Sequence, residues 1–468
     1  MVFSSLIFIF VFLPFTLLIY YISPKFLKNF ILLIASLIFY AWGEPVYVIL
    51  MISTITIMYF CTMLIDKYRE RVLVKNIFLI ITLVISLGIL IFFKYYGFII
   101  ENLNFIFHLQ IRIKQLPLPV GISFYTFQTL SYVIDVYSEK VAVQRNFITF
   151  AMYVTMFPQL VAGPIVRYID VVKEIDNRNE NTYLFGQGVE IFIIGLSKKV
   201  LLANNIGLLW NEIKSIPIEE LSILGAWIGI IAFTFQIYFD FSGYSDMAIG
   251  LGKMFGFNFM KNFNYPYISR SITEFWRRWH ISLGIWFREY VYIPLGGNRD
   301  GVIRQCRNLI IVWMLTGIWH GANWNFVIWG LYFGIFIIIE KIFLLKKLEK
   351  LPSVIGHLYT MLVVVIGWVF FSIESLTNAI KFLGTMFGLG NHSIIDDNII
   401  YLIYTNILLF IVLCFASTPI VRKVITNIKE KTIIKGDIFL LLVFMMAIFL
   451  STACLVNESF NPFLYFKF

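Results

Sequence analysis

His320 is the side chain best suited to acid–base chemistry, and it lies in the segment Thr316-Gly-Ile-Trp-His-Gly-Ala-Asn-Trp324. It separates two short apolar runs, residues 308–319 and 325–340, which predicts a break in a membrane helix. A neutral imidazole can accept a proton near pH 7, so His320 could act as a general base, with Asn323 orienting the ring or polarising a carbonyl group. The alternative is a structural histidine that bonds a neighbouring carbonyl. From position alone the two interpretations carry about equal weight, because an ionisable residue at membrane depth is a functional candidate by default.

A second polar segment runs Ser271-Ile-Thr-Glu-Phe-Trp-Arg-Arg-Trp-His-Ile-Ser282. Ser271 and Glu274 have the spacing of a capping box, which predicts that a helix begins here. On a continuous helix Trp276 and His280 would share one face, because residues four apart are neighbours on a helix surface.

Two arginines of this segment, Arg277 and Arg278, are flanked by Trp276 and Trp279. Guanidinium groups at a cytoplasmic interface could bind a lipid phosphate or a phosphorylated donor. Alternatively, the arginines extend to the interface and the tryptophans belong to an aromatic belt. The presence of His280 in the same segment favours a binding or catalytic function.

Two carboxylates, Asp240 and Asp246, occur in the apolar segment Gln236-Ile-Tyr-Phe-Asp-Phe-Ser-Gly-Tyr-Ser-Asp246. Their spacing of six does not place them on one helical face, so they are not expected to act as a carboxylate pair. An isolated buried charge is costly. Pairing with Arg277, Arg278 or a histidine is therefore expected, ahead of direct catalysis.

The elements that position these residues must be membrane helices. The 468 residues are 60% hydrophobic and only 14% charged, with a mean hydropathy of +0.84. One chain cannot hide this much apolar surface from water in its own core, which excludes a cytosolic enzyme, a disordered chain and a secreted disulfide scaffold. The net charge of +10 is expected to lie in cytoplasmic loops that face anionic lipid, so it does not indicate binding of nucleic acid. The four cysteines are scattered and indicate no metal site.

Apolar runs of bilayer length succeed one another along the chain, and they predict an all-α polytopic protein with about 11–13 membrane helices. One membrane domain over residues 1–468 is expected, with the motif-bearing core at 116–330. The clear runs are 3–22, 29–42, 46–65, 76–93, 147–166, 186–209, 222–239, 325–345, 354–372, 399–418 and 437–456.

Clusters of Lys and Arg at 67–75, 341–350 and 422–435 indicate cytoplasmic loops, which leaves the tail at 457–468 outside. Residues 240–325 carry more charge than lipid tolerates and must be buried in protein or line a wet cavity. The prolines and glycines of 116–127 predict a re-entrant or broken helix, and those of 157–164 predict a kinked helix end. Nucleotide, zinc-protease and serine-hydrolase motifs are absent from the sequence.

With these motifs in this order, the chain resembles the membrane-bound O-acyltransferase family, and in particular its bacterial alginate O-acetyltransferase-like and cell-wall polysaccharide O-acetyltransferase members. The resemblance extends over nearly the whole chain. It rests on Pro119-Val-Gly-Ile-Ser-Phe-Tyr-Thr-Phe127, Phe157-Pro-Gln-Leu-Val-Ala-Gly-Pro-Ile165, Phe239-Asp-Phe-Ser-Gly-Tyr-Ser-Asp246, Phe275-Trp-Arg-Arg-Trp-His-Ile-Ser-Leu283, Tyr292-Ile-Pro-Leu-Gly-Gly-Asn298 and the His320 segment.

The resemblance implies a ring of helices around a thin, funnel-shaped centre in the bacterial cytoplasmic membrane. It also implies that His320 is catalytic, that His280 lies near the site, and that an acyl group crosses from a cytoplasmic thioester, most simply acetyl-CoA. A secreted or membrane-tethered SGNH-type partner would then complete the transfer to a polysaccharide. Relatives that transfer D-alanine to teichoic acid share the His320-type motif and provide the alternative within the family. A transporter or flippase using a proton relay is the alternative from another class.

The C-terminal hexapeptide Phe463-Leu-Tyr-Phe-Lys-Phe468 follows the last apolar run, so it is expected at the outer interface. Aromatic residues there commonly anchor a protein at the interface. Because the polysaccharide is bulky and His320 is expected to be buried, Tyr465 is also a candidate to carry the acyl group as a phenyl ester. A similar tail in bacterial relatives supports this second interpretation by analogy only.

Overall fold

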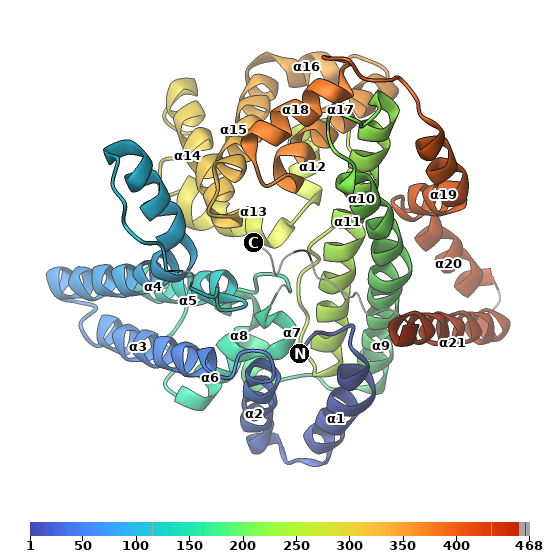
Figure 1. The fold of residues 1–468 in the computed structure, drawn as a ribbon. Helices are drawn as coiled ribbons and strands as arrows, with labels where there is room; N and C mark the ends of the chain where they lie inside the picture. Colours follow the sequence, from blue (N-terminus) through green and yellow to red (C-terminus); the bar gives the residue numbers. More distant parts are fainter. Residues whose placement is uncertain (115, 162, 432, 458–463, 465–468) are drawn as a thin grey trace. The chain divides into compact units, whose positions relative to one another are not determined.

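The structure, a computed structural model, describes residues 1–114, 116–161, 163–431, 433–457 and 464, without the side chains of residues 429–435. Every regular element in these ranges is a helix (Figure 1). The helices form two compact units, Met1–Phe192 with Tyr244–Met260 and Ile193–Gly243 with Lys261–Phe468, and α11 (Ile223–Met254) contributes to both. The expectation of an all-α protein is confirmed.

The first unit contains the N-terminal helices and most of α9. They are α1 (Leu13–Ile22), α2 (Lys28–Ala41), α3 (Tyr47–Lys67), α4 (Val72–Phe107), α5 (Ile122–Tyr137), α6 (Phe147–Thr155), α7 (Phe157–Leu160), α8 (Tyr168–Asp176) and α9 (Thr182–Ser197), with the short turns η1 (Phe8–Phe12) and η2 (Lys25–Leu27).

Of the candidate chemical residues that the structure describes, all except Asp246 lie in the second unit. Its helices are α10 (Asn205–Ser215), α12 (Ile272–Arg278), α13 (Ile281–Phe287), α14 (Val302–His320), α15 (Trp324–Ile339), α16 (Leu345–Leu348), α17 (Ser353–Ser372), α18 (Leu376–Met386), α19 (Asp397–Ala416), α20 (Ile420–Lys431) and α21 (Ile433–Asn457). Short helical turns continue several of them: η3 (Lys198–Asn204), η4 (Pro266–Ile268), η5 (Arg288–Tyr292) and η6 (Glu340–Leu344). α14 and α15 pack side by side (Figure 1).

Among the described residues, eight helical segments are long and apolar enough to cross a membrane. Other apolar runs that contribute to the expected 11–13 form shorter helices. The run at 29–42 becomes the 14-residue α2, and the run at 147–166 contains the nine-residue α6 and the four-residue α7. The eight segments of sufficient length and apolarity are Tyr47–Lys67, Val72–Phe107, Thr182–Ser215, Ile223–Met254, Trp324–Leu348, Ser353–Ser372, Asp397–Ala416 and Gly436–Asn457.

The motif at 157–164 interrupts a helix as expected, whereas Pro117 and Pro119 lie in the irregular segment between the end of α4 and the start of α5, so the first motif precedes a helix and does not break one. The backbone leaves the helical conformation at Met156, between α6 and α7, with Pro158 at the second position of α7. α5 begins after Gly121, whose φ is +77°. A Cβ at Gly121 would lie 2.8 Å from the carbonyl oxygen of Leu160, so the two motifs touch where only glycine fits.

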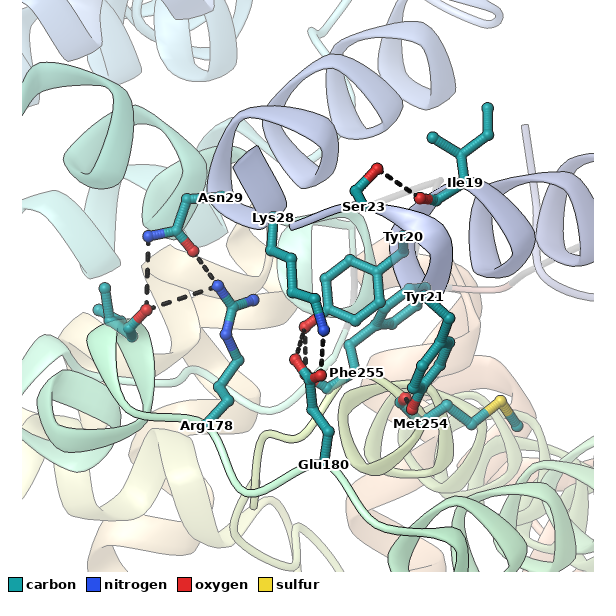
Figure 2. A network of polar contacts seen from close by, with 11 residues as sticks. Ile19, Tyr20, Tyr21, Ser23, Lys28, Asn29, Arg178, Glu180, Met254 and Phe255 are labelled. Atoms are coloured by element: carbon teal, nitrogen blue, oxygen red, sulfur yellow. Dashed lines mark hydrogen bonds and ion pairs between the residues drawn. The ribbon is translucent and has the colours of Figure 1, made fainter. Parts of the chain in front are cut away.

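A polar network fixes the turn between α1 and α2 within the first unit (Figure 2). Lys28 pairs with Glu180, and the Tyr20 hydroxyl donates to Glu180 Oε1 at 2.5 Å and to the Phe255 carbonyl at 3.1 Å. Arg178 donates to Asn29 Oδ1. These contacts join the α1–α2 turn, the segment before α9 and the end of α11, so the network stabilises the packing of these three segments.

Two reporter fusions test the orientation. A reporter after residue 430 is expected to be cytoplasmic and one after residue 468 extracellular, because the basic segment 422–435 should stay inside and Gly436–Asn457 can span the membrane. Paired phosphatase and fluorescent-protein fusions measure this in whole cells. Two cytoplasmic fusions would mean that the last helix does not cross.

Candidate functional site

His280 does not continue the helix that begins at Ser271. The Ser271 hydroxyl accepts from Glu274 N at 3.0 Å, which confirms the predicted start, but α12 ends at Arg278. Trp279 is extended, and His280 has a positive φ of +46° before α13. The expectation that Trp276 and His280 share one helical face is therefore wrong, because the backbone reverses between them.

Asn262, which lies outside every motif of the sequence, orients His280. Its Oδ1 accepts from the backbone N–H and the hydroxyl of Ser282, at 3.2 and 2.9 Å, and lies 3.2 Å from His280 Nδ1. Since a backbone N–H can only donate, it fixes the amide oxygen at this position, and Nδ1 must then carry the proton. The lone pair of His280 is on Nε2. His280 is 2% exposed and lies edge-on to the Phe241 ring at 4.7 Å.

His320 is the last residue of α14 and is 3% exposed. Its ring lies against three aromatic rings: Trp329 at 4.8 Å, Trp319 at 5.0 Å and Phe371 at 5.4 Å between centroids. The Trp319 ring also lies 6.1 Å from the His280 ring. The structure thus brings the two candidate histidines to one aromatic-lined site, where both imidazoles contact the Trp319 ring.

Gly317, one turn before His320, allows α14 to approach α15. A Cβ at this position would lie 2.2 Å from the Phe326 carbonyl oxygen and 3.3 Å from Gly330 Cα. The approach fixes the end of α14 and with it the imidazole of His320.

Replacing Gly317 with alanine is expected to lower the free energy of unfolding by about 1–3 kcal/mol, because the added methyl group forces the two backbones apart. Thermal unfolding of the detergent-solubilised protein measures the effect. Gly88→Ala is the matched control, since a Cβ there meets no atom within 4 Å. Equal transition temperatures for both variants would contradict the tight approach of α14 and α15.

Asp240 pairs with Lys199, and not with Arg277, Arg278 or a histidine as expected. Lys199 Nζ lies 2.7 Å from Asp240 Oδ1, and both side chains are 2% exposed. Lys199 is available to Asp240 because η3 turns it into the interior of the second unit. Arg278 instead pairs with Glu274 at 2.9 Å, and Arg277 is exposed. Asp246, also on α11, is half-buried in the part of the helix that belongs to the first unit.

Trp276 and Trp279 lie in packed aromatic surroundings. Trp276 contacts Trp313 at 4.8 Å and Phe333 at 4.9 Å, and Trp279 contacts Trp368 at 5.0 Å between ring centroids. Both rings therefore hold α12 against the core of the second unit, which orients the two arginines beside them.

Two further polar side chains cap helices of the second unit. Asn323 Oδ1 accepts from Asn325 N at 3.2 Å at the start of α15, and its amide donates to the Glu374 carbonyl at 2.9 Å. Glu340, fully buried, accepts from the backbone N–H groups of Ile272 and Thr273 at 2.6 and 2.8 Å. This carboxylate at the N-terminus of α12 is favourable because the helix dipole is positive there.

Tyr465 lies outside the described residues, but its neighbour Leu464 is described. Leu464 is half-buried, packs against the hydrophobic core of the second unit, and donates its backbone N–H to Asp240 Oδ2 at 2.9 Å.

The chemical character of the site follows from these contacts. It contains two buried imidazoles among tryptophan and phenylalanine rings, with one tautomer fixed by an amide. Rings that exclude water suit proton transfer to or from a hydroxyl group during an acyl transfer, because the reactive ester or thioester is protected from hydrolysis.

Comparisons with known proteins agree with this character. A family model described as MBOAT, membrane-bound O-acyltransferase family, matches residues 138–379. The chain is 38% identical to the probable alginate O-acetylase AlgI of Pseudomonas putida, over 100% of both chains. It is 36% identical to the peptidoglycan O-acetyltransferase of Helicobacter pylori, over 84% of this chain and 81% of that one. A teichoic acid D-alanyltransferase of Streptococcus thermophilus is 31% identical over 49% of this chain and 58% of its own length.

Proposed function

The chain belongs to the membrane-bound O-acyltransferase family and is a multi-pass membrane acyltransferase, and from this premise we propose that it transfers an acetyl group from a cytoplasmic thioester donor to an extracellular or cell-wall polysaccharide. The donor is acetyl-CoA, and its phosphates meet the cytoplasmic surface near Arg277 and Arg278. We infer a polysaccharide acceptor because similar proteins are named for the acetylation of alginate and of peptidoglycan.

The observation that carries this proposal is the buried pair of His320 and His280 around Trp319. We assign His320 as the general base. It removes the proton of the attacking hydroxyl while that oxygen bonds to the thioester carbonyl carbon. The tetrahedral intermediate then collapses, the C–S bond breaks, and the imidazolium returns the proton to the departing thiolate.

His280 has a supporting role in this proposal. Asn262 holds its proton on Nδ1, so Nε2 can accept a hydrogen bond from the attacking hydroxyl or from donor atoms near it. His280 has a positive φ and lies between α12 and α13, so the backbone of this short connection determines where its imidazole lies.

The acyl group reaches the polymer through Tyr465 in this proposal. The phenol oxygen attacks the thioester, and the resulting phenyl ester passes the acetyl group to an SGNH-type partner outside the membrane. The support from the described residues is Leu464, which packs against the hydrophobic core that also contains Trp329 and Phe371, two of the rings around His320.

Transfer of D-alanine is the alternative within the family, and the comparison with D-alanyltransferases extends over only about half of this chain. A donor-exchange experiment separates the two. Membranes with the chain and its SGNH-type partner are given labelled acetyl-CoA or a labelled D-alanyl carrier protein, and label in the polysaccharide is counted. We expect label from acetyl-CoA alone. Label from the carrier protein alone would overturn the acetyl assignment.

A further inference from the structure

Asp240 and Lys199 form a buried ion pair that the proposed chemistry at His320 does not use. Asp240 lies on α11 and Lys199 on η3, both in the second unit. One carboxylate oxygen, Oδ1, lies 2.7 Å from Lys199 Nζ, and Lys199 also donates to Asn204 Oδ1 at 2.8 Å. Two charges in a low-dielectric interior are costly unless their remaining hydrogen-bonding positions are also filled. The second oxygen of Asp240 therefore needs a donor.

That donor is the C-terminal segment of the chain. The backbone N–H of Leu464 donates to Asp240 Oδ2 at 2.9 Å, across 224 positions of sequence. A hydrogen bond from an amide to a buried carboxylate is stronger than one between neutral groups. The Leu464 side chain packs against the hydrophobic core of the same unit, so a polar and an apolar contact hold the same residue.

The distance along the chain permits this contact from the membrane surface. α21 ends at Asn457, and the seven residues from there to 464 extend at most about 25 Å. The hydrocarbon layer of a bilayer is about 30 Å thick, so a segment of this length can return to its middle. The contact places Leu464 against the hydrophobic core of the second unit.

We propose that Asp240, charged and oriented by Lys199, is the docking point that holds Leu464 of the C-terminal tail in the second unit. Asp240 is a positioning residue in this account: it fixes the residue immediately before Tyr465. The importance of the docking for acyl transfer rests on the function proposed above. The docking itself requires neither a donor nor an acceptor.

Hydrogen exchange at a single amide tests the docking. The full chain is placed in lipid nanodiscs without donor, and exchange of the Leu464 amide is followed by mass spectrometry with fragmentation. In the wild-type protein we expect exchange at least about tenfold slower than for an unprotected amide, because the charge-assisted bond must open first. Exchange at the unprotected rate in the wild type would overturn the proposal, whatever any variant does.

Variants assign the protection to Asp240. The double variant Lys199→Met, Asp240→Leu removes both charges together and so leaves none unpaired in the interior. We expect it to lose the protection at Leu464 while amides in α14 stay protected. Asn204→Ala is the matched control, because it removes a hydrogen bond of Lys199 but leaves Asp240, and it should keep the protection. Continued protection in the double variant would show that another group holds the tail. Activity of Tyr465→Phe bears on the relay and not on this result.

Discussion

Replacing His320 with alanine is expected to reduce acetyl transfer by about 10²–10⁴-fold while the protein still inserts and folds. The imidazole supplies the proton acceptor, and its loss leaves a space among three aromatic rings. The rate of acetyl transfer is measured as incorporation of label from acetyl-CoA into polysaccharide, in membranes with equal levels of the protein. Transfer near the wild-type rate would remove His320 from the mechanism.

His392→Ala is the control for this substitution. His392 contacts Thr385 Oγ1 and the Leu221 carbonyl, each at 3.2 Å, and no part of the proposed mechanism uses it. Its variant should retain transfer. His280→Ala is expected to lower transfer as well, but with a partial loss of thermal stability, because Asn262 and Phe241 lose their contacts with the ring.

Replacing Tyr465 with phenylalanine is expected to reduce polysaccharide acetylation to the background of cells lacking the chain. The change deletes one hydroxyl group and keeps the aromatic ring. Anchoring at the interface would therefore be retained, whereas the ability to carry an acyl group would be lost. Acetyl esters released from the isolated polysaccharide are the measurement.

Tyr404→Phe is the matched control for the tail variant, since Tyr404 is 78% exposed on α19. Its variant should acetylate normally. Wild-type acetylation by Tyr465→Phe would eliminate the relay while leaving the assignment of His320 in place, because the two variants test different atoms.

Local signals in the sequence predicted local structure well. The spacing of Ser271 and Glu274 predicted where α12 begins, because a capping box depends only on residues within one turn. The two short apolar runs around His320 predicted the break at which α14 ends. The end of α12 was not predictable in the same way, since the reversal at His280 depends on Asn262, which lies 18 residues earlier in the chain.

The pairing of charged residues far apart in the chain could not be predicted from the sequence. Lys199 follows another lysine and has the composition of a helix end at the membrane surface, yet η3 turns it inward to Asp240. Glu340 precedes Lys341 and suggests an exposed charged end, yet it caps α12. In both cases the partner lies on a helix distant in sequence, and nothing in the spacing of residues specifies which helices meet.

The central claim is that His320 catalyses transfer of an acetyl group from a thioester to Tyr465. Its most direct test is mass spectrometry of the C-terminal peptide after purified wild-type protein, without its partner, has been incubated with isotope-labelled acetyl-CoA. The account predicts a labelled acetyl ester on Tyr465 that hydroxylamine removes, and its absence from the His320→Ala protein. An unmodified Tyr465 in the wild-type protein, or equal labelling in both proteins, would contradict it.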